Sequence, residues 1–114
     1  MINGVHALIY SKKADEVRLF FQDVLKYPWV DAGHGWLVFA LPPAELGIHP
    51  AEDKQYYELY LMCDDIHATM AELEARGANF TGPAEDMGWG LMTALELPGG
   101  GAMALYEPRH PTPP

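Results

Sequence analysis

The sequence lacks three features that mark large classes of proteins: long apolar runs, paired cysteines and clustered basic residues. No apolar run approaches the ~20 residues of a transmembrane helix. The chain also does not begin with a basic region followed by an apolar core, so neither a membrane protein nor a signal peptide is expected. Cys63 is the only cysteine, which excludes a disulfide within the chain. Together these absences favour a protein of the reducing cytoplasm that does not contact a membrane.

Positive charge is scarce as well. The formal net charge is -9, from 16 acidic and 7 basic residues. Binding to nucleic acid needs clustered Lys and Arg to neutralise phosphates, and only Lys12 and Lys13 are adjacent in this chain. No nucleic-acid partner is therefore expected. The surplus of carboxylates is compatible with cationic ligands, although it also serves solubility.

Short catalytic motifs are missing too. The sequence contains no Gly-rich phosphate loop, no nucleophile elbow and no CxxC pair. Its 114 residues, of which 49% are hydrophobic, are those of one globular domain. A functional site has to be sought in the arrangement of the predicted elements.

That arrangement is one unit repeated twice. Each half has an apolar strand-like run, an amphipathic helical pattern and three further strand-like segments. The first half is predicted to have a strand at 4–10, a helix at 14–25 and strands at 29–31, 36–40 and 44–50. The second is predicted to have a strand at 56–63, a helix at 66–76 and strands at 80–85, 91–97 and 102–107. We therefore predict a single domain, 1–114, with module one at about 1–50, module two at about 56–109 and a proline-rich tail at 110–114.

Cap and turn residues support these bounds. Asp64 or Asp65 can cap the second helix, and Gly77 is placed to end it. Gly33-His34-Gly35 predicts a turn between two strands, and Pro98-Gly99-Gly100-Gly101 predicts the last hairpin turn.

The doubled pattern resembles the vicinal oxygen chelate superfamily, which includes glyoxalase I, extradiol dioxygenases, fosfomycin-resistance enzymes and bleomycin-resistance proteins. The resemblance extends from Gly4 to about Arg109. Its most specific pieces are Val5-His6-Ala7, Phe20-Phe21…Val24-Leu25, Asp64-Asp65-Ile66 and Leu105-Tyr106-Glu107-Pro108. It implies an α+β fold of two βαβββ modules that form a cup-shaped, mainly antiparallel sheet. It also implies a small-molecule ligand or substrate in the cup, and a homodimer.

The resemblance further implies which residues would hold a metal. The family's ligands come from the first and last strand of each module, and those positions here are His6, Glu45, Glu58 and Ala104. Alanine cannot bind a metal, so the implied ligand set is His6, Glu45 and Glu58 for a divalent Fe, Mn, Ni or Zn ion. Glu58 is then the candidate catalytic base, with Glu45 as the alternative.

Strand alternation tests the possible replacements for the lost ligand. Glu107 lies three residues from Ala104, so it is expected on the opposite face of the strand and cannot substitute for it. His49 shares the predicted face of Glu45 and is the reserve candidate.

Aromatic residues indicate a ligand pocket. Its predicted lining is Tyr10, Trp36, Tyr60, Trp89 and Met92, with plain core packing as the alternative for about half of them. Trp89 lies between two glycines, where a mobile loop could close over a ligand. The remaining histidines are expected at the surface: His34, His67 and His110.

These observations leave three functions open, so whether the protein is an enzyme stays undecided. The first is a metal-dependent lyase or dioxygenase that uses His6, Glu45 and Glu58. The second is a metal-free binding protein that sequesters a small aromatic or cationic compound, as bleomycin-resistance proteins do. The third is a stand-alone module in which the dimer interface matters more than a pocket.

Overall fold

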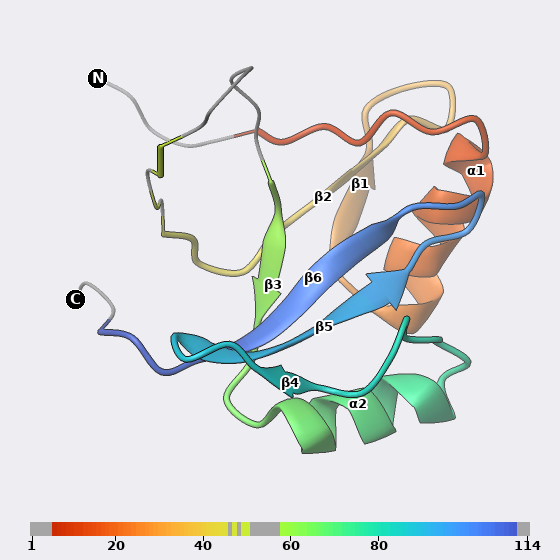
Figure 1. Cartoon of the computed structure of the whole chain (residues 1–114). Coiled ribbons are helices and arrows are strands. Elements are labelled where there is room, and N and C mark those ends of the chain that lie inside the picture. Colours follow the sequence, from red (N-terminus) through yellow and green to blue (C-terminus); the bar gives the residue numbers. More distant parts are fainter. Residues whose placement is uncertain (1–5, 46, 48, 51–57, 112–114) are drawn as a thin grey trace.

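The structure is a computed structural model of the chain that describes residues 6–45, 47, 49–50 and 58–111. Figure 1 shows two groups of strands, with one helix beside the turn at the end of β5 and β6 and another beneath them. None of the described helices is both long and apolar enough to cross a membrane.

The second module has the predicted order of strand, helix and three strands, but the strand predicted at 80–85 is corrected: it is a two-residue strand at Glu85–Asp86, preceded by an isolated bridge between Phe80 and Leu95. Its elements are β3 (Tyr60–Met62), α2 (Ile66–Ala75), β4 (Glu85–Asp86), β5 (Gly90–Glu96) and β6 (Ala102–Pro108). They form a sheet of order β3-β6-β5-β4, in which β3 runs parallel to β6 and the other pairs are antiparallel. The α+β class and the mainly antiparallel sheet are thus confirmed.

Local signals fix the ends of α2 as predicted. Asp65 is the N-cap, and its carboxylate accepts a hydrogen bond from the backbone N–H of Ala68 at 3.1 Å. Gly77 follows the helix with a φ of 93°, a conformation that costs glycine little. Glu107 of β6 accepts from the N–H of Ile66 at 3.0 Å, so a carboxylate from the sheet also caps the helix.

The first module contains one helical segment and one hairpin. The segment begins as α1 (Ala14–Leu19) and continues as a π-helix, η1 (Phe20–Val24). The hairpin pairs β1 (Trp29–Asp31) with β2 (Leu37–Phe39). Its turn is closed by Asp31, whose carboxylate accepts from Gly33 N at 2.7 Å and from Gly35 N at 3.2 Å.

Two predicted strands of the first module are corrected by the structure. Residues 6–10, from the strand predicted at 4–10, have no strand structure and are exposed. Residues 44–45, 47 and 49–50, from the strand predicted at 44–50, likewise form no strand; residues 4, 5, 46 and 48 lie outside the described part. A strand exists only where a neighbour completes its hydrogen-bond ladder, and sequence alternation alone cannot supply that neighbour. The hairpin and the four-stranded sheet remain separate sheets within the described chain.

The core lies on one face of the four-stranded sheet. The register puts Leu61, Leu95 and Leu105 on that face, where they pack with buried residues of both helical segments. The further members of this core are Val17, Phe21, Ile66, Leu73, Ala78 and Met103. Arg76, after α2, ties the two helical segments together by donating to the carbonyl oxygen of Val24 at 2.9 Å.

The opposite face of the sheet is not covered by either helix, and we call it the open face. Strand pairing brings together on it Tyr60 and Met62 of β3, Met92 and Ala94 of β5, and Ala104 and Tyr106 of β6. Tyr106 is the buried member of this set, and the others are half-buried or exposed. The open face is where the sequence placed the site.

Gly90 provides a test of the register between β5 and β6. A Cβ at Gly90 would lie 2.6 Å from the carbonyl oxygen of Glu107, so Gly90→Ala forces these strands apart. We expect a loss of about 1–3 kcal/mol in the free energy of unfolding, measured by denaturant titration at fixed protein concentration. Gly82→Ala is the matched control, since a Cβ there meets nothing within 4 Å. Equal stability of both variants would show that the strands do not approach as described.

Candidate functional site

Three aromatic rings meet on the open face, one from each of three neighbouring segments. The ring of Tyr106 lies 5.6 Å from that of Tyr60 and 5.5 Å from that of Trp89, and the centroids of Tyr60 and Trp89 are 6.4 Å apart. The ring planes are steeply inclined to one another, at 89° for Tyr60–Tyr106, 74° for Trp89–Tyr106 and 60° for Tyr60–Trp89. Edge-to-face pairs at these separations are favourable aromatic contacts. We call this set the aromatic cluster.

Trp89 is held in place by backbone hydrogen bonds. It occupies the tight turn between β4 and β5, which is closed by Met87 N–H donating to the carbonyl of Gly90 at 2.8 Å. The carbonyl of Trp89 accepts from Arg109 N, just after β6, also at 2.8 Å. The sequence had indicated a loop that closes over a ligand, whereas the structure shows a turn bonded to the neighbouring strand end. Trp89 therefore forms one wall of the cluster.

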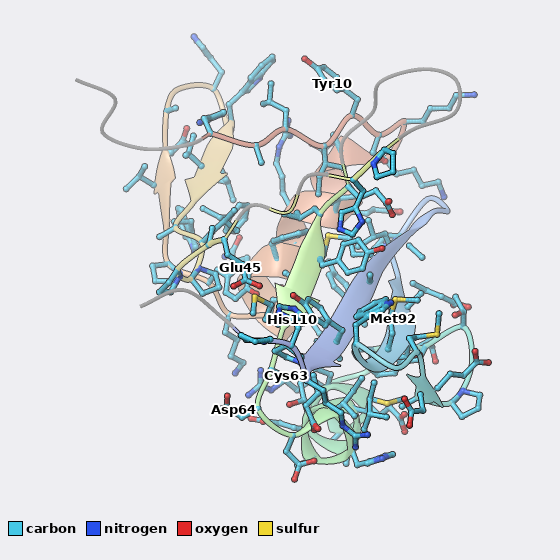
Figure 2. The ribbon with its side chains drawn as sticks, turned by 60° about the vertical axis from the view of Figure 1, so that its left-hand side comes forward. Tyr10, Glu45, Cys63, Asp64, Met92 and His110 are labelled. Atoms are coloured by element: carbon cyan, nitrogen blue, oxygen red, sulfur yellow. The ribbon has the colours of Figure 1, made fainter. Side chains whose placement is uncertain are left out.

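A carboxylate and an imidazole converge on the hydroxyl of Tyr106; they belong to Glu45 and His110, which lie close together in Figure 2. The hydroxyl lies 3.3 Å from Oε1 of Glu45 and 3.3 Å from Nε2 of His110, whose ring stacks on the tyrosine at 6.0 Å. Nε2 of His110 is also 3.8 Å from Glu45 Oε1. Nδ1 of His110 lies 2.9 Å from the carbonyl oxygen of Pro111, so it carries a hydrogen and donates to that acceptor.

Hydrogen counting shows what this arrangement favours. In neutral His110, Nε2 is an acceptor, and the single hydrogen of Tyr106 can be donated to the imidazole or to Glu45 but not to both. When Tyr106 donates to the carboxylate of Glu45, Nε2 of His110 receives no hydrogen from this hydroxyl. The side chain of Glu45 is 22% exposed, so its carboxylate is reached from solvent while it contacts Tyr106.

Burial raises the pKa of the Tyr106 hydroxyl above its ordinary value of 10.0, and the negative charge of Glu45 and its hydrogen bond to Tyr106 raise it further. A second carboxylate lies at the same cluster, where Glu58 accepts from the hydroxyl of Tyr60 at 3.3 Å. Each tyrosine of the aromatic cluster therefore carries a glutamate at its hydroxyl.

The structure brings together some of the predicted pocket residues and leaves others apart. Tyr60 and Trp89 belong to the aromatic cluster, and Met92 is the register partner of Tyr106 on the same face. Tyr10 is 89% exposed in the segment before α1, and Figure 2 shows it away from Glu45, His110 and Met92. Trp36 is 67% exposed beside the hairpin, with the guanidinium of Arg18 over its ring at 5.9 Å.

The sequence pattern did not single out two residues of this site, Tyr106 and His110. Tyr106 has the strand parity of Ala104, two residues earlier, and that signal was sufficient to place it on the site face. His110 was expected at the surface because it lies in the proline-rich tail. The structure instead half-buries it against Tyr106, four residues earlier in the chain, and beside the distant Glu45.

The residues implied as metal ligands can be compared with the geometry a metal needs. His6 is exposed outside any strand, Glu58 is exposed beside Tyr60, and Glu45 is half-buried beside Tyr106. Among residues 6–45, 47, 49–50 and 58–111, no group of three or more His, Cys, Asp or Glu side chains is arranged to hold a metal ion. The reserve candidate His49 belongs to the same described part and forms no such group either. The arrangement within one chain therefore does not fit a metal ion.

Strand parity correctly excluded Glu107 as a replacement ligand. Ala104 faces the open side beside Tyr60, whereas Glu107 turns to the helix-covered side and caps α2.

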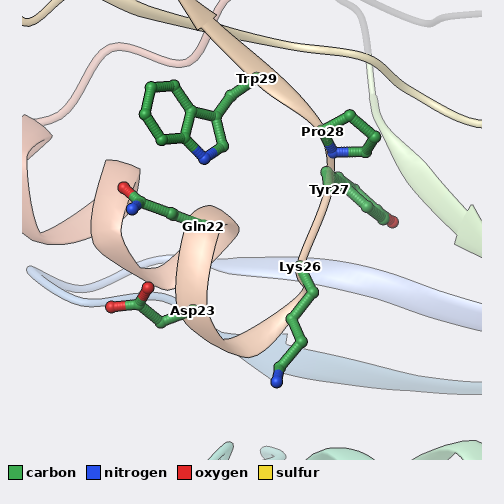
Figure 3. A pocket seen from close by; sticks show the side chains of 6 residues that line it. All are labelled: Gln22, Asp23, Lys26, Tyr27, Pro28 and Trp29. Carbon is green, nitrogen blue, oxygen red and sulfur yellow. The ribbon is translucent and has the colours of Figure 1, made fainter.

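The two described depressions lie away from the aromatic cluster. One, of about 660 Å³, lies at the end of η1 and is open to solvent. Figure 3 shows its lining residues, Gln22, Asp23, Lys26, Tyr27, Pro28 and Trp29. The other, of about 530 Å³, is lined by Met70 and Glu74 of α2 and by the segment that follows the helix. Neither depression contains a residue that the sequence placed in the site.

Comparison with known proteins identifies the family. Residues 5–108 match the model of the Glyoxalase/Bleomycin resistance protein/Dioxygenase superfamily. The chain belongs to this superfamily. No curated protein matches the sequence.

Solved structures of the superfamily share the fold over nearly the whole chain. TnmS3, an antibiotic binding protein from Streptomyces sp. CB03234, is 22% identical with a TM-score of 0.68, and the match covers 94% of this chain and 97% of TnmS3. A superfamily member from Sphaerobacter thermophilus is 26% identical with a TM-score of 0.60, over 93% of this chain and 98% of the other. Lactoylglutathione lyase from Agrobacterium tumefaciens is 14% identical with a TM-score of 0.62, over 92% of each chain. This superfamily fold thus occurs both in a binding protein and in an enzyme.

The contact between Glu45 and Tyr106 can be tested by titration. Glu45→Gln removes the charge that raises the pKa of Tyr106, so we expect that pKa to fall toward 10.0 while burial still holds it above. The measurement is near-ultraviolet tyrosinate absorbance, with Tyr106→Phe identifying the signal of this one hydroxyl. Because the folded pKa is raised, the stability it contributes is complete below about pH 10 and is lost as the pH rises through the folded pKa.

Glu74→Gln is the matched control, because it removes the same charge from an exposed position on α2. It should leave the titration of Tyr106 unchanged. An unchanged titration in Glu45→Gln would mean that the carboxylate does not contact Tyr106 in solution.

Proposed function

We propose that the protein is a metal-free binding protein that sequesters a small aromatic or cationic compound on the open face. The observation that carries this proposal is the aromatic cluster, with Glu45 and Glu58 at its tyrosine hydroxyls. Aromatic walls with a few polar groups are the usual composition of a small-molecule site. The likeness to the antibiotic binding protein TnmS3 supports a binding role on this fold.

The site chemistry favours binding over metal-dependent catalysis. Ala104 offers no ligating atom on the open face, and His6, Glu45 and Glu58 do not form a metal-binding group within one chain. The rings of the aromatic cluster, by contrast, can contact a ligand directly without a metal ion. The assignment of His6, Glu45 and Glu58 as ligands, with Glu58 as the base of a metal-dependent lyase or dioxygenase, stays the sequence-based alternative.

The functional unit in this proposal is a homodimer. A monomeric protein of 12.7 kDa is expected to expose about 6,200 Å², whereas this chain exposes 8900 Å². Its radius of gyration is 15.1 Å, above the about 13 Å expected for a compact domain of this length. The excess area is larger than the roughly 800 Å² that each partner buries in an interface of standard size.

Exposed apolar residues indicate where the second copy would lie. Many belong to the first module: Leu8, Ile9, Tyr10, Trp29, Val30, Trp36, Val38 and Leu41. Val30 and Val38 are direct register partners in the hairpin and are 64% and 38% exposed. A two-stranded hairpin is marginal by itself, so a partner chain that covers it also stabilises it.

The binding role is tested with a neutral naphthol and nitrogen-labelled protein. We expect the naphthol to shift the indole N–H resonance of Trp89, because that ring walls the aromatic cluster, and to leave the resonance of Trp36 unchanged. Trp89→Leu, followed at backbone amides of the open face, should weaken binding about fivefold, since an aromatic contact is worth roughly 1 kcal/mol beyond its area, whereas the matched Trp36→Leu should not. Chelator should leave the affinity unchanged.

Elemental analysis of the same protein preparation tests the metal-dependent alternative. Near-stoichiometric Mn, Fe, Ni or Zn that disappears in His6→Ala, together with chelator-sensitive activity, would establish the metal-dependent alternative and overturn the binding proposal.

The dimer is tested by placing charge on the hairpin. Val30→Lys combined with Val38→Lys puts two ammonium groups opposite each other on its exposed face, so we expect a shift from dimer to monomer in analytical ultracentrifugation. Ala75→Lys, at an exposed position at the end of α2, is the control and should remain dimeric. A wild-type chain that sediments as a monomer at all concentrations would refute the dimer.

A further inference from the structure

Carboxylates on the two faces of the second module's sheet have different partners. On the helix-covered side, Glu107 caps α2 through Ile66 N and Asp86 pairs with Arg109 at 3.6 Å. On the open side, Glu85 of β4 is the register partner of Met92 and is exposed. Glu45 and Glu58 reach this side through the hydroxyls of Tyr106 and Tyr60.

The basic residues of the described second module are engaged away from the open face. Arg76 binds Glu72 and the carbonyl of Val24, and Arg109 binds Asp86. Within the described ranges, the one ion-pair contact of Glu45 is with His110, and no ion pair involves Glu58 or Glu85. Among the described residues, the open face therefore gathers carboxylates that form no ion pair with a Lys or Arg side chain.

The aromatic cluster also attracts cations, in addition to the carboxylates. An aromatic ring has a negative face, and a cation within about 6 Å of its centroid is stabilised most when water is excluded. Tyr60, Trp89 and Tyr106 lie at steep mutual angles, so their faces point in different directions around one small region. The methionines Met62 and Met92 supply apolar surface on the same face.

These two attractions together select one chemical class. A neutral aromatic ligand gains from the rings but leaves the carboxylate of Glu45 half-buried and without a permanent counter-charge, and an anionic ligand is repelled by it. A small inorganic cation keeps its water shell and gains little from aromatic faces. A substituted ammonium group carries charge with apolar substituents and so satisfies both.

We propose that the group recognised by this site is an organic ammonium cation, held against Tyr60, Trp89 and Tyr106 with Glu45 and Glu58 as its counter-charges. This inference rests on the proposed binding function and specifies the ligand class of the same site. Glu45 and Glu58 are its specificity-determining residues, because the rings alone accept neutral compounds as well.

The test compares choline with dimethylbutanol, in which carbon replaces the charged nitrogen and the shape is retained. Binding is followed at the indole N–H of Trp89 in nitrogen-labelled protein. We expect choline to bind about tenfold more tightly than dimethylbutanol. Glu45→Gln and Glu58→Gln should each weaken choline binding about fivefold and leave dimethylbutanol unaffected. Glu74→Gln is the control for net charge, since it removes one carboxylate from α2 and should change neither affinity.

Each other outcome overturns the inference. Equal affinities for the two compounds would show that charge is not recognised, and equal weakening by Glu74→Gln and Glu45→Gln would show attraction by the net charge of the chain instead of a site. Binding of neither compound would also refute the ammonium site. The naphthol titration decides the proposed binding function independently of these results.

Discussion

The pairing of β6 with both of its neighbours is the constraint on which the rest of this structure depends. Because β6 is hydrogen-bonded to β3 on one side and to β5 on the other, the orientation of each of its residues is fixed. Leu105 points into the core, Tyr106 points to the open face, and Glu107 points back to cap α2. A slip of one residue would place Tyr106 under the helix and Leu105 in solvent. The same register therefore determines core, site and helix cap.

Both helical segments lie on one face of the sheet, so the other face and the hairpin are left without a helix over them. The buried core is confined to that side, where Val17 and Phe21 of the first module meet Leu61 and Leu95 of the second. The hairpin is attached mainly through Phe39, whose ring lies 5.5 Å from that of Phe21. Its valines and the segment before α1 remain exposed. Burial of such surfaces is the main favourable term in association, which is why the proposed unit is two chains.

The proposed site combines two kinds of attraction that are weak at an exposed surface. A single surface ion pair is worth little, and a single cation–π contact is worth about 0.5–1 kcal/mol. The aromatic cluster concentrates three rings, and the tyrosine hydroxyls fix the directions of Glu45 and Glu58. Pre-positioned groups lose less side-chain entropy on binding, so the arrangement gains affinity from order as well as from charge. This reasoning concerns the site itself, because superfamily membership leaves the chemistry open.

The sequence by itself determined the helix ends and the hairpin turn, because these depend on residues that are close together in the chain. Asp65, Gly77 and the Gly33–Gly35 turn marked a helix and a hairpin correctly, since caps and turns involve residues a few positions apart. The repeat and its motifs also led to the α+β fold, and strand parity excluded Glu107. The tertiary structure decided what depends on distant partners. It removed the strands predicted around His6 and Glu45, separated Tyr10 and Trp36 from the aromatic cluster, and brought Glu45 to Tyr106. The last contact joins residues 61 positions apart, and no local periodicity encodes which distant side chains will meet.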